Sequence, residues 1–289
     1  MVDRAESVTV IEPGRGGLWG ALRESWQHRE LLYFLAWRDV KVRYKQTVLG
    51  VAWAILQPLA TMAVFTLVFH RVGGIQAPGG LPYPVFAFAG LLPWMLFQSA
   101  LLGASSSIVN EARLVTKVYF PRLLVPLSTV ISGLIDFAVS FVVLAAMIAV
   151  YARQPAYRAL LPGPAVLLLP VFVLLAVLSA LAAGLWLSAL NAKYRDFRYV
   201  VPFLATIWMF LSPVAYSAAD LAGKLPGAWG WLLGLNPMTG VLEGFRWALL
   251  GAGGVALEPL LISVGATGLV LVGGLFYFRR MERSFADLL

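Results

Sequence analysis

Long apolar stretches alternate with short polar connections along most of the 289-residue chain. A helix rises about 1.5 Å per residue, so about 20 apolar residues cross the roughly 30 Å hydrocarbon core of a bilayer. Six stretches approach or exceed this length: 48–69, 84–104, 127–150, 165–190, 199–216 and 257–278. The pattern predicts an all-α membrane protein with a six-span domain over 48–278, a cytoplasmic N-terminal region over 1–47 and a cytoplasmic tail over 279–289.

The basic residues predict the orientation of these spans. Of the 22 lysines and arginines, 17 lie in the N-terminal region, the tail and the connections 105–126 and 191–198. Basic residues collect on the cytoplasmic side of membrane proteins. We therefore expect both termini inside the cell, and we interpret the net charge of +8 as a determinant of topology rather than a nucleic-acid surface.

The segment 28–45 has the spacing of an amphipathic helix, with aromatic residues on one face and mostly basic residues on another. The aromatic and aliphatic positions are Tyr33, Trp37, Val40 and Tyr44. The charged positions are Glu30, Arg38, Lys41 and Lys45. Such a helix lies in the headgroup region. Two interpretations remain open: a basic anchor beside the first span, or an interface helix that frames a cytosolic partner.

The connection 217–256 differs from the other loops because it is long and half apolar. Its two apolar runs, 227–235 and 238–250, are each too short to cross a bilayer. Asn236-Pro237 separates them, and this pair is typical of a turn. The pattern favours a re-entrant helix pair that enters from the outer face, with a flat interfacial loop as the alternative.

Composition excludes several classes of protein. Apolar residues make up 60% of the chain and charged residues 12%, about half the charge of a soluble domain. A soluble enzyme and a disordered chain are therefore excluded. Cysteine is absent, and His28 and His70 have no further ligand at metal-binding spacing, so we expect no metal site.

The chain also lacks the motifs of an energy-converting enzyme. Neither a Walker A pattern, nor G-x-G-x-x-G, nor H-E-x-x-H occurs in the sequence. We therefore expect no enzymatic activity and no bound cofactor in this chain. If it performs active transport, the energy comes from a partner chain or from an ion gradient.

Asp136 is the clear case of an ionisable residue within a predicted span. An aspartate near the bilayer centre costs about 2.5–3.5 kcal/mol on insertion scales. It serves either as a hydrogen-bonded packing residue or in substrate passage and coupling. A single carboxylate and the absence of an inverted repeat favour a separate ATPase over the alternative, an ion-coupled carrier or flippase that works alone.

Short motifs in the loops add a family resemblance. They are WRDVKVRYK at 37–45, LGVAW at 49–53, QP at 57–58, VYFPR at 118–122, NAKYRDF at 191–197, SPVAY at 212–216 and LNPM at 235–238. Arg246 follows nine residues after Pro237. In this order and on six spans, the series resembles the permease subunit of type-2 ABC exporters for polysaccharides and polyol phosphates, which include O-antigen, capsular polysaccharide and teichoic acid exporters.

The resemblance implies a homodimer in the bacterial inner membrane, with two cytosolic nucleotide-binding subunits that hold ATP and Mg²⁺. It implies an interface helix over 31–45, a coupling region over 110–122 and a re-entrant pair over 227–250. The cargo would be an undecaprenyl-linked glycan, or a polyol-phosphate polymer, that leaves the cytoplasm.

Two sets of candidate residues follow from these expectations. The expected ATPase-coupling interface consists of Arg38, Lys41, Glu111, Arg113, Lys117, Tyr119 and Arg122. A glycan path needs aromatic faces for sugars and few fixed charges. The candidate path residues are Trp53, Phe86, Phe88, Trp94, Phe97, Asp136, Trp208 and Phe210.

Overall fold

The computed structural model describes residues 18–45, 52–160, 163–223, 232–251 and 257–288. No strand occurs in these residues, so the expected all-α architecture is confirmed for them. The helices are α1 (Leu18–Gln27), α2 (Arg29–Lys45), α3 (Ala52–Phe65), α4 (Tyr83–Asn110), α5 (Ala112–Lys117), α6 (Leu124–Ala152), α7 (Leu169–Lys193), α8 (Phe197–Leu211), α9 (Ala218–Ala222), α10 (Leu232–Leu235), α11 (Pro237–Leu250), α12 (Leu257–Glu282) and α13 (Phe285–Leu288). A π-helical segment, Thr66–Val72, continues α3, and short 3₁₀ segments occupy Pro78–Gly80, Pro155–Leu160 and Pro164–Leu168.

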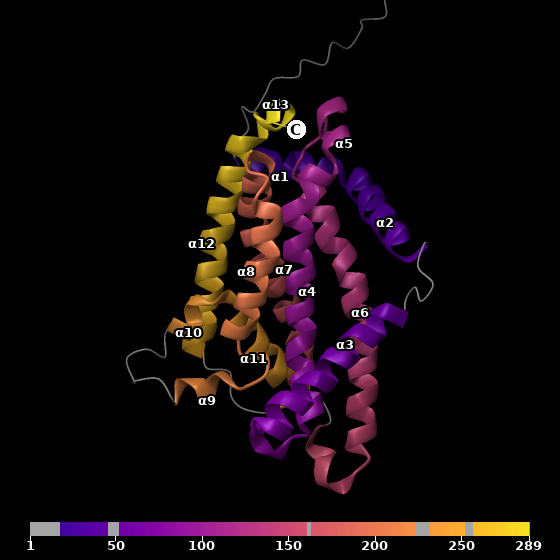
Figure 1. The fold of residues 1–289 in the computed structure, drawn as a ribbon, viewed down its shortest axis with the longest axis vertical. Helices are drawn as coiled ribbons and strands as arrows, with labels where there is room; N and C mark the ends of the chain where they lie inside the picture. The colour runs from indigo at the N-terminus through magenta and orange to yellow at the C-terminus, as the bar shows by residue number, and fades with distance from the viewer. Residues whose placement is uncertain (1–17, 46–51, 161–162, 224–231, 252–256, 289) are drawn as a thin grey trace, which may run out of the picture.

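Helices α4 and α7 form the centre of the bundle, with α6 and α12 packed beside them (Figure 1). Small residues let these helices approach closely. A Cβ placed on Gly184 of α7 would lie 2.8 Å from the Cβ of Ala104 on α4. The apolar part of α4 is 78% buried within the protein, whereas that of α3 is 11% buried. The core therefore sits around α4, and α3 presents most of its apolar surface outward.

Five helical segments are long and apolar enough to cross a membrane: Ala52–Val72, Tyr83–Asn110, Leu124–Ala152, Pro164–Lys193 and Leu257–Glu282. Five of the six predicted spans correspond to them. The stretch expected to span over 199–216 forms α8, which has 15 residues and a length of about 22 Å. It ends because Ser212 precedes Pro213, and a residue before proline is driven out of helical geometry; Ser212 is indeed extended, at φ −101° and ψ 146°.

The two ends of the bundle carry different short helices (Figure 1). Helices α1, α5 and α13 gather at one end, which we call the upper end, and α9, α10 and α11 lie at the other, which we call the lower end. The predicted pair of short helices is represented by α10 and α11, which are separated at Asn236; residues 227–231 of the first run lie outside the described residues. The Asn236 side chain accepts a hydrogen bond from the main-chain N–H of Met238, and so caps α11.

Candidate functional site

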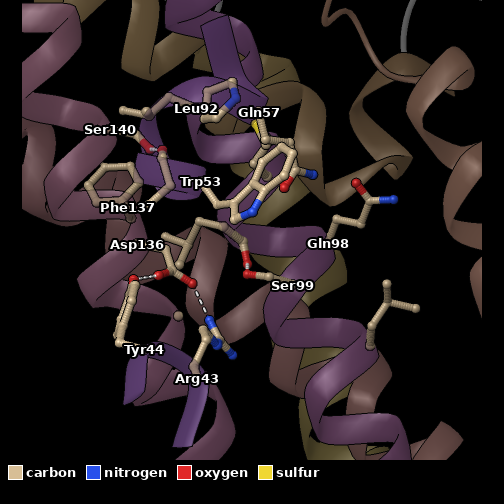
Figure 2. Close-up of a pocket in the computed structure, with 16 residues that line it drawn as sticks. Arg43, Tyr44, Trp53, Gln57, Leu92, Gln98, Ser99, Asp136, Phe137 and Ser140 are labelled. Atoms are coloured by element: carbon tan, nitrogen blue, oxygen red, sulfur yellow. Dashed lines mark hydrogen bonds and ion pairs between the residues drawn. The ribbon is translucent and has the colours of Figure 1, made fainter. Parts of the chain in front are cut away.

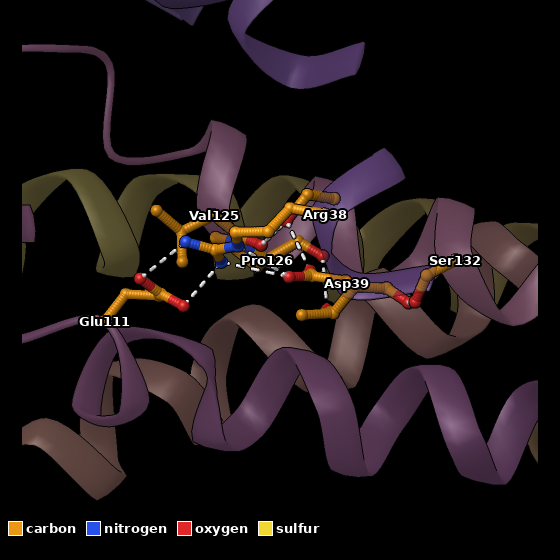
Figure 3. Close-up of polar contacts among 8 residues, drawn as sticks. Arg38, Asp39, Glu111, Val125, Pro126 and Ser132 are labelled. Atoms are coloured by element: carbon orange, nitrogen blue, oxygen red, sulfur yellow. Dashed lines mark hydrogen bonds and ion pairs between the residues drawn. The ribbon is translucent and has the colours of Figure 1, made fainter. Parts of the chain in front are cut away.

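At the upper end, one arginine joins three elements (Figure 3). The guanidinium of Arg38 on α2 donates to both carboxylate oxygens of Glu111, at 3.2 and 2.5 Å, in the junction between α4 and α5. It also donates to Asp39, at 2.9 Å, and Asp39 in turn accepts a bond from the hydroxyl of Ser128 on α6. We call these four residues the Arg38 cluster. It attaches the predicted interface helix to the start of the predicted coupling region.

The electrostatic environment of the Arg38 cluster favours the charged form of the Arg38 guanidinium. Partial burial lowers the pKa of Arg38, but hydrogen bonds and charge attraction from Glu111 and Asp39 outweigh it, so the pKa lies above its ordinary value. Arg38 therefore stays protonated at any physiological pH. Its forked donors suit two carboxylates at once, which a lysine ammonium does not match.

The far side of α5 is attached to the last long helix. The main-chain N–H of Arg122 donates to the carboxylate of Glu282 at 3.2 Å, and the Arg122 guanidinium donates to the Glu282 carbonyl. Next to this contact, Phe285 of α13 is fully buried against Phe278, with ring centroids 5.3 Å apart. Helix α5 is thus held between α2 on one side and α12–α13 on the other.

Other members of the predicted coupling set lie on the surface of the upper end. Arg113 and Lys117 are exposed on α5, and Tyr119 just after it is 66% exposed. Lys41 is exposed on α2, with its ammonium 5.5 Å from the ring centroid of Trp37. The seven coupling residues therefore divide into three that bind other elements and four that face outward from α2, from α5 and from the residues just after α5.

A cavity of about 420 Å³ lies between the end of α2 and helices α3, α4 and α6 (Figure 2). Two of the predicted path residues, Trp53 and Asp136, line it together. The Asp136 carboxylate accepts hydrogen bonds from the Tyr44 hydroxyl and the Arg43 guanidinium. Desolvation, and then the hydrogen bond to Asp136, raise the pKa of Tyr44 to about 12, so its hydroxyl is a neutral donor. We call this site the Trp53 cavity.

The other predicted path residues lie elsewhere. Phe88, Trp94 and Phe97 are fully buried on α4, where the Phe97 ring meets Trp208 of α8 edge to face, at 4.9 Å. Phe86 is buried near the lower end of α4, and Phe210 is 59% exposed on α8. The structure therefore brings together Trp53 with Asp136, and separately the α4 aromatics with Trp208.

Sequence reasoning missed a second arginine site, at the lower end. Arg246 of α11, counted from sequence among the outer loop residues, is 2% exposed. Its guanidinium donates to the carbonyls of Pro213 at 2.7 Å, of Tyr216 at 3.1 Å and of Val214, and it lies 3.9 Å from the ring centroid of Phe86. We call this arrangement the Arg246 clamp. The spacing of SPVAY and Arg246 signalled a motif, but nothing in it indicated burial.

The described residues hold no group of three or more histidines, aspartates or glutamates placed to bind a metal ion. Cation–carboxylate pairs instead dominate the polar sites, as in the Arg38 cluster and at Asp136. Such pairs position helices and contact ligands, whereas neither site offers a nucleophile with an adjacent base.

Comparison with known proteins places these sites in a family context. Residues 30–250 match a family of ABC-2 type transporters. The O-antigen export system permease protein RfbA of Myxococcus xanthus is 31% identical over 266 residues, covering 92% of this chain and 98% of that protein. RfbA of Klebsiella pneumoniae is 28% identical over 90% of this chain and 95% of its own length. The polysialic acid transport protein KpsM of Escherichia coli is 24% identical over 86% and 92%.

The matched region begins at α2 and ends with α11. It therefore contains the Arg38 cluster, the Trp53 cavity and the Arg246 clamp. The contact between Arg122 and Glu282 extends beyond it at one partner, because Glu282 lies at the end of α12.

Proposed function

Because the chain belongs to the ABC-2 type transporter family, we propose that it is the membrane subunit of an ATP-driven exporter of a lipid-linked polysaccharide. It is a multi-pass protein of the bacterial inner membrane. The relatives with assigned cargo export O-antigen or polysialic acid, and this supports a glycan rather than an ion or a small solute. The carrier lipid of the proposed cargo is an undecaprenyl chain.

The main support for the coupling proposal is that the residues on both sides of α5 are attached to other helices, α2 and α12. A partner ATPase delivers work only through a rigid element. Helix α5 is flanked by Glu111, which binds Arg38 of α2, and by Arg122, which binds Glu282 at the end of α12. Displacement of α5 would therefore act on α2 and on the end of α12 together. The exposed Arg113, Lys117 and Tyr119 supply the surface for the partner.

The orientation follows from this assignment. The upper end, with α1 and α13, faces the cytoplasm in this proposal, and α10 and α11 form the proposed re-entrant pair at the outer face. ATP and Mg²⁺ bind to the two partner subunits and not to this chain, which has no nucleotide motif.

A twofold dimer completes the proposed assembly. Helices α3 and α8 leave large apolar side chains uncovered, including Val64 at 56% exposure and Phe203 at 65%. Lipid or a second copy covers such surfaces, and closed twofold symmetry is the commonest arrangement of identical subunits. The proposed path for the glycan runs along this dimer, past Trp53 and Phe210, the exposed aromatic members of the candidate set.

The decisive experiment combines the purified permease with its cognate ATPase in lipid nanodiscs. We expect a two-plus-two complex, no ATP hydrolysis by the permease alone, and glycan export that stops when the Walker A lysine of the partner is replaced. Export that continues with that replacement, but stops with a protonophore that leaves cellular ATP intact, would instead identify an ion-coupled carrier.

A further inference from the structure

The Trp53 cavity contains polar side chains that the protein itself does not satisfy. Among the described residues, the side-chain amides of Gln57 and Gln98 make no hydrogen bond to the protein. Both line the cavity, from α3 and α4 respectively (Figure 2). Gln57 is exposed and Gln98 is half-buried, so both amides are free to bind a polar ligand that enters the cavity.

An aromatic face lies beside these amides. The indole of Trp53 lines the same cavity and is 51% exposed, with no ring partner among the described residues. Aromatic rings carry negative charge on their faces and attract the weakly positive C–H groups of a ligand. A pyranose ring offers such C–H groups on its flat face and hydroxyls around its edge, so it matches an indole surrounded by amides.

The charged residues that line the cavity disfavour the binding of an anionic ligand. Its charged lining residues are Arg43 and Asp136, and these form an ion pair with each other. The pair leaves no net charge, and the Tyr44 hydroxyl is committed to Asp136 as a donor. A bare phosphate or pyrophosphate would have to compete with Asp136 for Arg43. A neutral ligand with many hydroxyls meets no such cost.

From these three observations we infer that the Trp53 cavity is a binding site for a neutral sugar unit of the exported glycan. The indole of Trp53 packs against the face of the sugar, and Gln57, Gln98 and the Ser99 hydroxyl bond to its edge. The inference rests on the proposed export function and specifies its substrate contact. The volume of about 420 Å³ lies within the range of small-ligand sites, roughly 300–1,000 Å³.

The position of the cavity also connects it, through α2, to the predicted coupling region. Its lining comes from α2, α3, α4 and α6, and the Asp136 ion pair ties the end of α2 to α6. The same α2 carries Arg38, which binds the coupling region at Glu111. Movement of α2 would therefore alter the Arg38 cluster and the sugar site together.

The test is saturation-transfer NMR on the permease–ATPase complex in nanodiscs, with methyl α-D-glucopyranoside and the methyl glycoside of N-acetylglucosamine as neutral probes. Glycerol 3-phosphate serves as the anionic probe. We expect transfer to both sugars, strongest at the ring C–H protons, and little to glycerol phosphate. Trp53→Leu and Gln98→Leu should each lower sugar transfer about fivefold or more, the size of one lost hydrogen bond or its equivalent.

Matched controls replace the same residue types outside the cavity. Trp26→Leu and Gln76→Leu change exposed residues of α1 and of the loop after α3, and should retain wild-type transfer. The inference is overturned by the absence of transfer in the wild type, by stronger transfer to glycerol phosphate, or by unchanged transfer in both cavity variants.

Export in cells separates this inference from the proposed function. If deletion of the chain abolishes surface glycan while the two cavity variants bind sugar and export like the wild type, the exporter assignment stands and the sugar site is wrong. If deletion leaves surface glycan intact, the exporter assignment itself is wrong.

Discussion

The upper and lower ends of the molecule each use one arginine to join segments far apart in sequence, but in opposite environments. The Arg246 side chain at the lower end is 3% exposed and binds main-chain carbonyls after α8 together with the carboxylate of Glu243. The Arg38 side chain at the upper end is 39% exposed and binds the carboxylates of Glu111 and Asp39. One cation is enclosed by protein, and the other remains accessible to solvent.

This difference indicates which end can change shape. A buried cation that loses its partners pays a large desolvation cost, so the Arg246 clamp has one arrangement. A solvent-accessible ion pair contributes little net stability because water replaces its partners when it opens. We therefore expect the lower end to keep its contacts, and the upper end to exchange contacts when the proposed partner ATPase moves.

The largest effect on the stability of the protein is expected from Arg246→Leu. The change leaves the carbonyls of Pro213, Val214 and Tyr216 without their donor, and each unsatisfied group costs about 1–3 kcal/mol. We expect destabilisation of about 3 kcal/mol or more, measured as thermal unfolding of the purified protein. Arg246→Lys should recover only part of it, because an ammonium lacks the forked donors.

The matched control for Arg246 is Arg153→Leu, which alters an exposed arginine after α6. It should unfold like the wild type. If Arg246→Leu also unfolds like the wild type, the lower end is not held by its buried cation, and the contrast between the two ends fails.

The next effect is expected from Gly90→Ala. A Cβ at this position would overlap the Arg246 guanidinium and lie 2.7 Å from the Val214 carbonyl oxygen. Overpacking of this kind costs about 1–3 kcal/mol, to be read from the same unfolding measurement. Gly265→Ala on α12 is the control, since nothing lies within 4 Å of its Cβ position. A Gly90→Ala protein as stable as this control would show that the clamp is loose.

At the upper end, Glu111→Gln should change stability by less than about 1 kcal/mol, because the pair is solvent-accessible. Transport should respond more strongly, with less glycan exported per ATP hydrolysed by the complex. Arg38→Gln combined with Glu111→Gln should be little worse than the single change, as expected when two residues share one interaction. Full export efficiency in Glu111→Gln would contradict a role of the Arg38 cluster in coupling.

The smallest effect on stability is expected from Tyr44→Phe, and this effect should be visible only at high pH. The pKa of Tyr44 is about 12 in the folded chain and 10.0 for an ordinary tyrosine. Its contribution to stability is therefore complete below about pH 10 and is lost as pH rises through 12, where the unfolded chain has already released the proton. Wild-type protein and the control Tyr33→Phe should show this loss in full, and Tyr44→Phe should show a smaller loss. An identical alkaline profile for Tyr44→Phe would exclude the hydrogen bond to Asp136.

Much of the helical arrangement was predictable from apolar length and loop composition. The predicted interface helix over 31–45 lies within α2, and the predicted break at Asn236-Pro237 separates α10 from α11. The exception is α8, which is shorter than the stretch 199–216. Hydropathy alone extended that stretch through Ser212 and Pro213, whereas backbone sterics before proline ended the helix.

The candidate site was predictable in part. The charged residues in and around α5 were expected at the coupling region because the resemblance to type-2 ABC exporters implied such a region over 110–122. Their pairing was not predictable, since Arg38 and Glu111 are 73 residues apart and no periodicity relates them. Trp53 and Asp136 were named for their residue types, and only packing placed them in one cavity with Gln57 and Gln98.

The sequence by itself determined the class of molecule: an all-α membrane protein without a nucleotide site of its own, in a family of ABC exporters. These properties depend on composition, on segment length against bilayer thickness and on local motifs, all of which are local along the chain. The tertiary structure alone decided which arginine is buried, which carboxylate each cation binds and which amides share a cavity. Such properties depend on the distance between residues far apart in sequence, and distance is set only when the helices pack.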